Sequence, residues 1–148
     1  MIKIKLYIDV DGVILTNIKA TPTIVLANYI DKFLTFCLDN FDCYWLTTHC
    51  KYGDTKNVLK YLKSYCDESI FQKIAKIKPV KWKTLKTEAI DLSSKFFWID
   101  DAPMYTELEF LRKYNLEKNF LNINTKKNND DLLNAIKILE EKIFKVHI

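Results

Sequence analysis

Two aspartates at the end of an apolar run are the residues of this chain with the clearest chemical meaning. Asp9 and Asp11 stand two positions apart at the mouth of a strand predicted over 3–9, and Gly12 follows them. Two carboxylates this close resist joint ionisation unless a positive charge lies between them. A hard divalent cation with oxygen ligands is the natural partner, and Mg²⁺ is the favoured ion. The alternative is a turn with solvated aspartates, because Asp and Gly are ordinary turn residues.

A second acidic pair follows another apolar strand. The strand predicted over 96–99 runs directly into Asp100 and Asp101. Adjacent side chains of an extended strand point to opposite faces, so only a turn lets both carboxylates face one ion. We expect one of them to ligate Mg²⁺ directly and the other through water, since this ion keeps part of its hydration shell. A helix-entry turn in Asp-Asp-Ala-Pro is the alternative.

Two threonines end a further predicted strand, over 42–47. Thr47 offers a hydroxyl and a backbone N–H to phosphoryl oxygens, and Thr48 could cap the next turn or share that work. The alternative is that both threonines simply end the strand. The position at a strand end favours a functional Thr47.

A phosphoryl group among several carboxylates also needs a nearby cation, because one divalent ion leaves excess negative charge. We expect Lys83 to supply it, since Lys83 opens the helix predicted over 83–94, which leads into the strand before Asp100. Lys78, Lys81 and Lys86 are close alternatives in the sequence, and a solvated lysine face is the remaining interpretation.

Alternating strands and helices must bring these groups together. The predicted strands cover 3–9, 42–47, 70–74, 96–99 and 119–123, and the predicted helices run from Thr21-Pro22 to about Cys37 and over 54–66, 83–94, 105–115 and 129–145. This alternation predicts an α/β fold with a mostly parallel five-stranded sheet and helices on both faces. Ligands of such sheets lie outside the carboxyl ends of the strands, so Asp9, Thr47 and Asp100 are expected at one edge.

Composition sets the wider limits. The chain has 148 residues, of which 49% are hydrophobic, and this predicts one domain over 1–148 with a sizeable core. The absence of a long apolar run or a leader pattern at the start predicts a cytoplasmic protein without membrane segments. The net charge is +4, and residues 51–95 hold eleven lysines against five acids. Such a basic sector would attract a polyanion, although solvated lysine faces are common.

The four cysteines do not suggest a metal site. They share no Cys-x-x-Cys spacing, and His49-Cys50 does not complete a structural zinc pattern. We expect reduced thiols, mostly in the core. These cysteines are Cys37, Cys43, Cys50 and Cys66.

Four short segments resemble, in order, the motifs of haloacid dehalogenase (HAD) superfamily phosphatases. They are Asp9-Val10-Asp11-Gly12-Val13, Trp45-Leu46-Thr47-Thr48, Lys83 and Trp98-Ile99-Asp100-Asp101. The combined segments, with a tryptophan before both the Thr-Thr and the Asp-Asp pair, are most similar to the capless HAD branch associated with RNA-repair proteins. The resemblance implies a three-layer Rossmann-like core without a cap domain.

The resemblance also implies a Mg²⁺-dependent phosphomonoesterase. Asp9 would attack phosphorus and carry an aspartyl phosphate, and Asp11 would protonate the leaving oxygen and later deprotonate water. An acid at position 11 favours a phosphatase over a dehalogenase. The implied phosphate-binding residues are Thr47, Thr48 and Lys83, and the implied metal ligands are Asp9, Asp11, Asp100 and Asp101.

An uncapped site would be open to bulky phosphorylated substrates, including phosphoproteins and nucleic-acid ends. Trp82 lies among lysines that could hold a nucleic-acid backbone while the indole stacks on a base. A nucleotide or polynucleotide end is therefore the expected partner. The lysines are Lys76, Lys78, Lys81, Lys83 and Lys86.

Two other functional classes use related residues. A receiver-like signalling domain also combines an Asp pair, a Thr and a Lys, but it carries its adjacent acids after the first strand, the reverse of the order here. A catalytically idle HAD-fold binding module is the other alternative. The presence of Asp11 argues against it, because an idle descendant needs no general acid.

Overall fold

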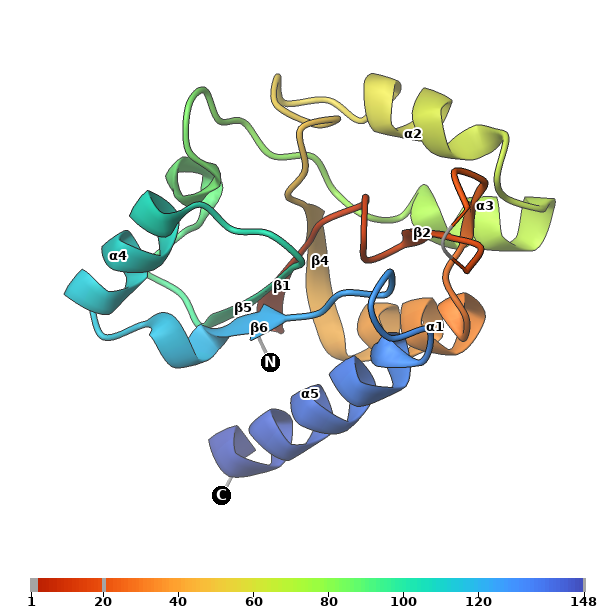
Figure 1. The fold of residues 1–148 in the computed structure, drawn as a ribbon. Coiled ribbons are helices and arrows are strands. Elements are labelled where there is room, and N and C mark those ends of the chain that lie inside the picture. Colours follow the sequence, from red (N-terminus) through yellow and green to blue (C-terminus); the bar gives the residue numbers. More distant parts are fainter. Residues whose placement is uncertain (1–2, 20, 148) are drawn as a thin grey trace.

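The centre of the fold is a sheet of four parallel strands in the order β4-β1-β5-β6 (Figure 1). The computed structural model describes residues 3–19 and 21–147, and side chains as far as residue 145, so residues 1, 2, 20 and 148 of the predicted domain lie outside it. The strands are β1 (Ile4–Ile8), β4 (Phe41–Trp45), β5 (Phe96–Asp100) and β6 (Phe120–Asn122). The predicted α/β fold with a mostly parallel sheet is confirmed.

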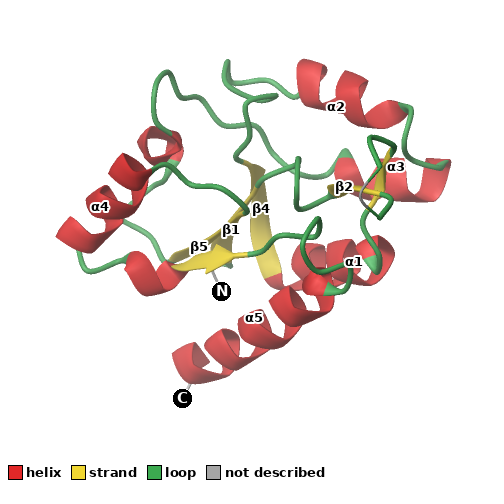
Figure 2. Ribbon diagram, viewed as in Figure 1, coloured by secondary structure: helices red, strands yellow, loops and turns green. Residues whose placement is uncertain are grey.

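Helices lie on both faces of this sheet (Figures 1 and 2). Helices α1 and α5 contact each other on one side, and α4 contacts the short helix η1 on the other. Right-handed connections between parallel strands produce this distribution when the chain reverses direction across the sheet. The helices are α1 (Ile30–Asn40), α2 (Lys56–Lys63), α3 (Glu68–Ile74), α4 (Tyr105–Lys113) and α5 (Asp131–His147), with 3-10 turns η1 (Lys86–Ala89) and η2 (Glu117–Asn119).

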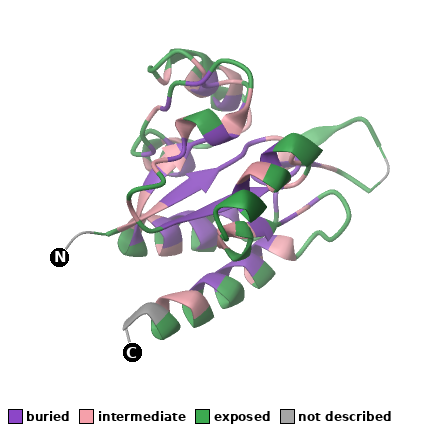
Figure 3. Ribbon diagram, turned by 90° about the vertical axis from the view of Figure 1, so that its left-hand side faces the viewer, coloured by how far each residue is buried: buried purple, intermediate pink, exposed green. Residues whose placement is uncertain are grey.

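The core follows the sheet and the inner helix faces (Figure 3). All five residues of β5 are buried, as a central parallel strand requires. Large side chains of neighbouring strands fill the space between the layers, among them Trp45, Trp98 and Tyr7. All three described core cysteines are free thiols, and Cys66 is a free thiol of intermediate burial, in agreement with the expectation.

The predicted fifth strand, over 70–74, is wrong. These residues belong to α3, where the Asp67 carboxylate caps the helix by accepting a hydrogen bond from the Ile70 backbone N–H at 2.8 Å. Ile70 and Ile74 are one turn apart and both are buried. The spacing of these two isoleucines after an N-cap aspartate is the helical signal that outweighs their β propensity.

The predicted helix start at Thr21-Pro22 is also wrong. Strands β2 (Leu15–Asn17) and β3 (Ile24–Leu26) form a small antiparallel sheet there, and α1 begins only at Ile30. The Thr21 hydroxyl donates to the Ile18 carbonyl at 2.6 Å. The hydroxyl and the proline therefore shape a hairpin connection instead of a helix cap.

The helix predicted over 83–94 is wrong in length and type, because only the short 3-10 helix η1 over Lys86–Ala89 forms there. The Glu88 carboxylate accepts hydrogen bonds from the backbone N–H groups of Lys83, Thr84 and Leu85 at 3.0, 3.3 and 2.9 Å. These bonds hold residues 83–85 in a turn before η1 begins at Lys86. The other predicted elements occur with ends shifted by up to three residues. The described residues form no additional domain: β1 and α1 are joined through the β2–β3 hairpin, and β4 and β5 through α2, α3 and η1.

Candidate active site

Strand register brings two of the aspartates together. β1 and β5 are parallel with Ile8 opposite Ile99, so the residues that follow, Asp9 and Asp100, lie side by side at the carboxyl edge. The Asp9 backbone N–H donates to the Ile99 carbonyl at 3.1 Å, which continues the ladder to this point. The residues are only 6% and 1% exposed. Two buried carboxylates are thus held close together at the end of the sheet.

Asp101 completes the acidic cluster, which consists of Asp9, Asp100 and Asp101. One carboxylate oxygen from each residue lies within 4.8 Å of the other two. Gly12 makes room for this arrangement, because a Cβ atom built at position 12 would lie 2.1 Å from Asp101 Oδ2. Gly12 also has a φ of +79°, a region that glycine enters at little cost. The Asp-x-Asp-Gly pattern therefore serves the second acidic pair as well as the first.

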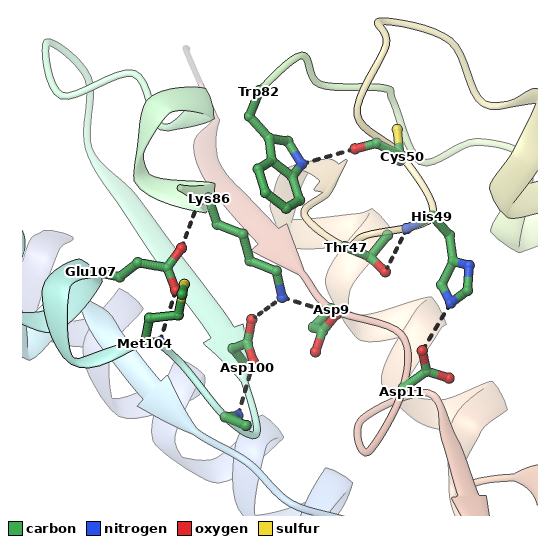
Figure 4. A network of polar contacts seen from close by, with 11 residues as sticks. Asp9, Asp11, Thr47, His49, Cys50, Trp82, Lys86, Asp100, Met104 and Glu107 are labelled. Carbon is green, nitrogen blue, oxygen red and sulfur yellow. Dashed lines mark hydrogen bonds and ion pairs between the residues drawn. The ribbon is translucent and has the colours of Figure 1, made fainter. Parts of the chain in front are cut away.

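Lys86 is the cation of the cluster (Figure 4). Its Nζ lies 2.6 Å from Asp100 Oδ2 and 3.4 Å from Asp9 Oδ1, and its side chain is 13% exposed. A buried ammonium between two carboxylates reduces their repulsion, and its attraction to each of them offsets part of the cost of burying the charges. When all three carboxylates of the cluster are ionised, one ammonium still leaves an excess of negative charge.

Glu107 holds the segment that carries Lys86. The buried Glu107 carboxylate accepts from the Lys86 backbone N–H at 2.6 Å and from the Met104 backbone N–H at 2.8 Å (Figure 4). One contact fixes the start of η1 and the other the start of α4. Glu107 thereby ties the lysine to the loop that follows Asp101.

The electrostatics of the cluster reflect this crowding. Burial and the neighbouring Asp100 raise the pKa of Asp9 from its ordinary value of 3.8 to about 8, although Lys86 opposes the shift. Burial and Asp100 also raise the pKa of Asp101. Burial lowers the pKa of Lys86, but attraction to Asp9 and Asp100 outweighs it and the pKa is raised overall. Additional positive charge would favour the ionised form of Asp9.

Asp11 lies outside the acidic cluster. Its Oδ2 is 2.9 Å from His49 Nε2, and its Oδ1 accepts a hydrogen bond from the Tyr61 hydroxyl at 2.8 Å. The side chain is 45% exposed, in contrast to Asp9. The i, i+2 spacing of the two aspartates therefore does not bring their carboxylates into one group, because the ladder with β5 continues only as far as Asp9 and Asp11 lies in the loop beyond it.

The two threonines differ in their surroundings. Thr47 is fully buried just beyond β4, and its hydroxyl oxygen accepts a hydrogen bond from the His49 backbone N–H at 3.3 Å. Figure 4 shows its side chain on the same side of the sheet edge as Asp9 and Lys86. Thr48 is exposed, and its side chain makes no hydrogen bond within the described residues.

The lysines expected near the site take separate positions. Lys83 is exposed, and its backbone N–H bonds to Glu88, so it does not open a helix as predicted. Lys78 forms an ion pair with Asp42 at 2.7 Å. Lys81 is exposed, and its backbone pairs with that of Tyr52 in an isolated β-bridge. The structure brings Lys86, an alternative in the sequence, to the carboxylates instead of Lys83.

Trp82 is not available as a stacking surface. It is 9% exposed, its indole N–H donates to the Cys50 carbonyl at 3.0 Å, and Lys51 Nζ lies 4.4 Å from the ring centroid. Sequence reasoning missed three other residues of the site: Glu107, His49 and Tyr61. The only sequence signal for Glu107 is its position as an acid in the first turn of a predicted helix. His49 and Tyr61 lie far from Asp11 in the sequence, and only the fold brings them to it.

The donor set of the acidic cluster fits a hard divalent cation. Its ligand atoms are carboxylate oxygens, two of the three residues are buried, and their close approach leaves negative charge that Lys86 does not balance. The His and Cys residues that zinc prefers are not part of it. Asp9, Asp100 and Asp101 are therefore the residues that could hold the ion.

Comparison with known proteins adds no assignment. The sequence matches no protein-family model and no curated protein. Among the described residues, no helix combines the length and apolar character needed to cross a membrane.

Proposed function

We propose that the protein is a Mg²⁺-dependent phosphohydrolase that acts through an aspartyl phosphate on Asp9. The observation that supports this most directly is the buried cluster of Asp9, Asp100 and Asp101 with Lys86 Nζ between two of the carboxylates. A buried excess of negative charge at the carboxyl edge of a parallel sheet is costly for stability, and a cation-assisted reaction gives it a purpose. The motif order that resembles HAD phosphatases points to the same reaction.

Asp9 is the proposed nucleophile. Its carboxylate oxygen attacks phosphorus, the bond from phosphorus to the leaving oxygen breaks, and a mixed anhydride forms on Asp9. When bound, Mg²⁺ would supply positive charge that stabilises the phosphoryl oxygens and the carboxylates. Asp100 and Asp101 would hold this ion together with Asp9. Because burial and Asp100 raise the pKa of Asp9 to about 8, added positive charge is needed to make the nucleophile anionic at neutral pH.

Asp11 is the proposed acid and base. It donates a proton to the leaving oxygen in the first step, then takes a proton from the water that attacks phosphorus and releases Asp9. Lys86 and the Thr47 hydroxyl and backbone N–H stabilise the charge on the transferring group. The role expected for Lys83 passes to Lys86 in this proposal, because Lys86 is the lysine in contact with Asp9.

Hydrolysis of an aryl phosphate tests the proposal. The wild-type protein should release the phenol only with Mg²⁺, and Asp9→Asn should lose activity by a factor of at least about 10³, because it removes the nucleophile. Rapid acid quench during turnover should trap phosphate on the wild-type protein and not on Asp9→Asn. Asp39→Asn is the matched control, since Asp39 is exposed near the end of α1. Absence of turnover on aryl phosphate and on phosphorylated nucleotides would contradict the proposal.

A nucleotide or polynucleotide end is the proposed substrate. The chain offers an exposed aromatic ring on the loop after β4, because Tyr52 is 74% exposed, and its backbone pairs with that of the exposed Lys81 in an isolated antiparallel β-bridge. An aromatic ring beside a cation suits a base and its backbone. Tyr52→Ala should raise KM for a phosphorylated oligonucleotide about tenfold and leave the aryl phosphate unaffected, since stacking contributes roughly 1–3 kcal/mol per base.

Tyr114→Ala is the matched control for Tyr52, because Tyr114 is also exposed but follows α4. An equal KM for the two variants on the oligonucleotide would contradict the nucleic-acid substrate without affecting the phosphohydrolase proposal. A catalytically idle binding module remains the alternative function. It predicts oligonucleotide binding by the wild-type protein with no phosphate release.

A further inference from the structure

We propose that His49 and Tyr61 are positioning residues that fix the Asp11 carboxylate for proton transfer. This inference rests on the proposed function, in which Asp11 is the acid and base. It concerns the group formed by Asp11, His49 and Tyr61, which lies beside the acidic cluster without contributing to it.

The two residues bind the two oxygens of Asp11 separately. His49 Nε2 lies 2.9 Å from Oδ2, and the Tyr61 hydroxyl donates to Oδ1 at 2.8 Å. An aspartate side chain has two rotatable bonds, and contacts to both oxygens from different segments fix both of them. The Asp11 carboxylate therefore has one defined orientation although its side chain is 45% exposed.

His49 and Tyr61 are themselves held in place. Their rings stack with centroids 3.9 Å apart and an angle of 16° between the planes. The His49 backbone N–H donates to the Thr47 hydroxyl oxygen, and the Tyr61 ring packs edge-on against Tyr65. The contacts thus connect the loop after β4, helix α2 and the loop after β1.

The Tyr61 hydroxyl is suited to act as a permanent donor. Burial and the contact with Asp11 raise the pKa of Tyr61 to about 12, so the hydroxyl keeps its proton at any working pH. A half-exposed pair of this kind contributes little to folding stability. Orientation of a proton-transfer group is a purpose that fits better, because small misplacements reduce catalysis strongly.

The chemical step gives this inference a specific signature. As Asp9 bonds to phosphorus and the leaving oxygen departs, the proton of Asp11 passes to that oxygen. An alkoxide is a poor leaving group and needs this proton, whereas an acidic phenol such as nitrophenol leaves without it. A misplaced Asp11 should therefore slow alkyl phosphates much more than activated aryl phosphates.

The test compares kcat/KM for both substrate types in Tyr61→Phe, His49→Leu and wild-type proteins. Because kcat/KM reports the steps through the first irreversible one, it isolates leaving-group departure. Each variant should lose about ten- to a hundredfold on the alkyl phosphate, the loss expected for a hydrogen bond to a charged group, and less than about threefold on the aryl phosphate. Tyr65→Phe is the matched control and should change neither value by more than about twofold.

His49→Gln provides a rescue, because its side-chain amide can offer an N–H near the position of Nε2. It should recover most of the alkyl phosphate activity that His49→Leu loses. If Tyr61→Phe slows both substrates equally, or behaves like Tyr65→Phe, the inference is overturned while the phosphohydrolase proposal stands. A wild-type protein inactive on both substrates would overturn the proposed function and, with it, this inference.

Discussion

The charged groups at the end of β1 and β5 divide into two sets with different chemistry. Asp9 and Asp100 are buried and share the Lys86 ammonium, whereas Asp11 is half-exposed and bonded to His49. Burial makes the first set respond strongly to added positive charge, and hydrogen bonds fix the orientation of the second. In the proposed reaction, this division would separate the nucleophile, Asp9, from the group that transfers protons, Asp11.

The lysine assignment can be tested at the residue scale. Lys86→Met keeps the apolar stem but removes the charge next to Asp9, so kcat/KM for an aryl phosphate should fall by roughly 10² to 10³. Lys83→Met is the control and should stay within about threefold of the wild type, because Lys83 is exposed. Thermal unfolding should verify that both variants fold. A larger loss in Lys83→Met than in Lys86→Met would reverse the assignment.

At the scale of elements, the site depends on where strands end and on which loops come close. The register of β1 and β5 aligns Asp9 with Asp100, and the turn after β5 adds Asp101. Gly12 then determines how closely the loop after β1 approaches that turn. Regular elements supply the positions, and one glycine supplies the space.

Replacement of Gly12 tests this close approach. Gly12→Ala meets both the cost of a positive φ and a clash with the Asp101 carboxylate, whereas Gly53→Ala meets only the first, since nothing lies within 4 Å of its added Cβ. Gly53→Ala should therefore cost about 1–2 kcal/mol of unfolding free energy. Gly12→Ala should cost a further 1–3 kcal/mol or so and weaken stabilisation by Mg²⁺.

Chemical denaturation with and without Mg²⁺ measures both effects. Equal losses for Gly12→Ala and Gly53→Ala, with the same response to Mg²⁺, would mean that Asp101 does not depend on the space above Gly12. The comparison is clean because both glycines have a positive φ, of +79° and +87°.

At the scale of the whole molecule, an excess of buried negative charge couples the site to folding. The pKa of Asp9 is about 8 in the folded protein and near its ordinary value of 3.8 in the unfolded chain. Between these values the folded state binds more protons, so its contribution to stability is present at low pH and lost as the pH rises toward 8. The site therefore makes the metal-free protein less stable at neutral and alkaline pH.

This coupling predicts a pH-dependent effect of Asp9→Asn. In the presence of EDTA the variant should unfold at a higher temperature than the wild type at pH 8, and the difference should shrink toward pH 5, because the wild-type carboxyl is then protonated. Mg²⁺ at pH 8 should stabilise the wild type by mass action and the variant much less. A wild-type protein that gains stability relative to Asp9→Asn between pH 5 and 8 in EDTA would contradict the prediction.

Much of the fold and part of the site could be predicted from local patterns. Apolar runs that lead to Asp9, Thr47 and Asp100 predict parallel strands, and parallel strands place their carboxyl ends at one edge. The same patterns gave a wrong strand over residues 70–74. A short apolar segment is compatible with a strand or a helix, and here the Asp67 cap favours the helix.

The sequence by itself determined the acids at the strand ends, because strand periodicity and the ends of apolar runs are local properties of the chain. Only the tertiary structure decided that Lys86 joins Asp9 and that His49 and Tyr61 bind Asp11. These side chains come from irregular or distant segments, whose direction is set by hydrogen bonds to Glu88 and Glu107 and by ring stacking. Such contacts leave no periodic trace in a sequence, since they exist only once separate elements have packed together.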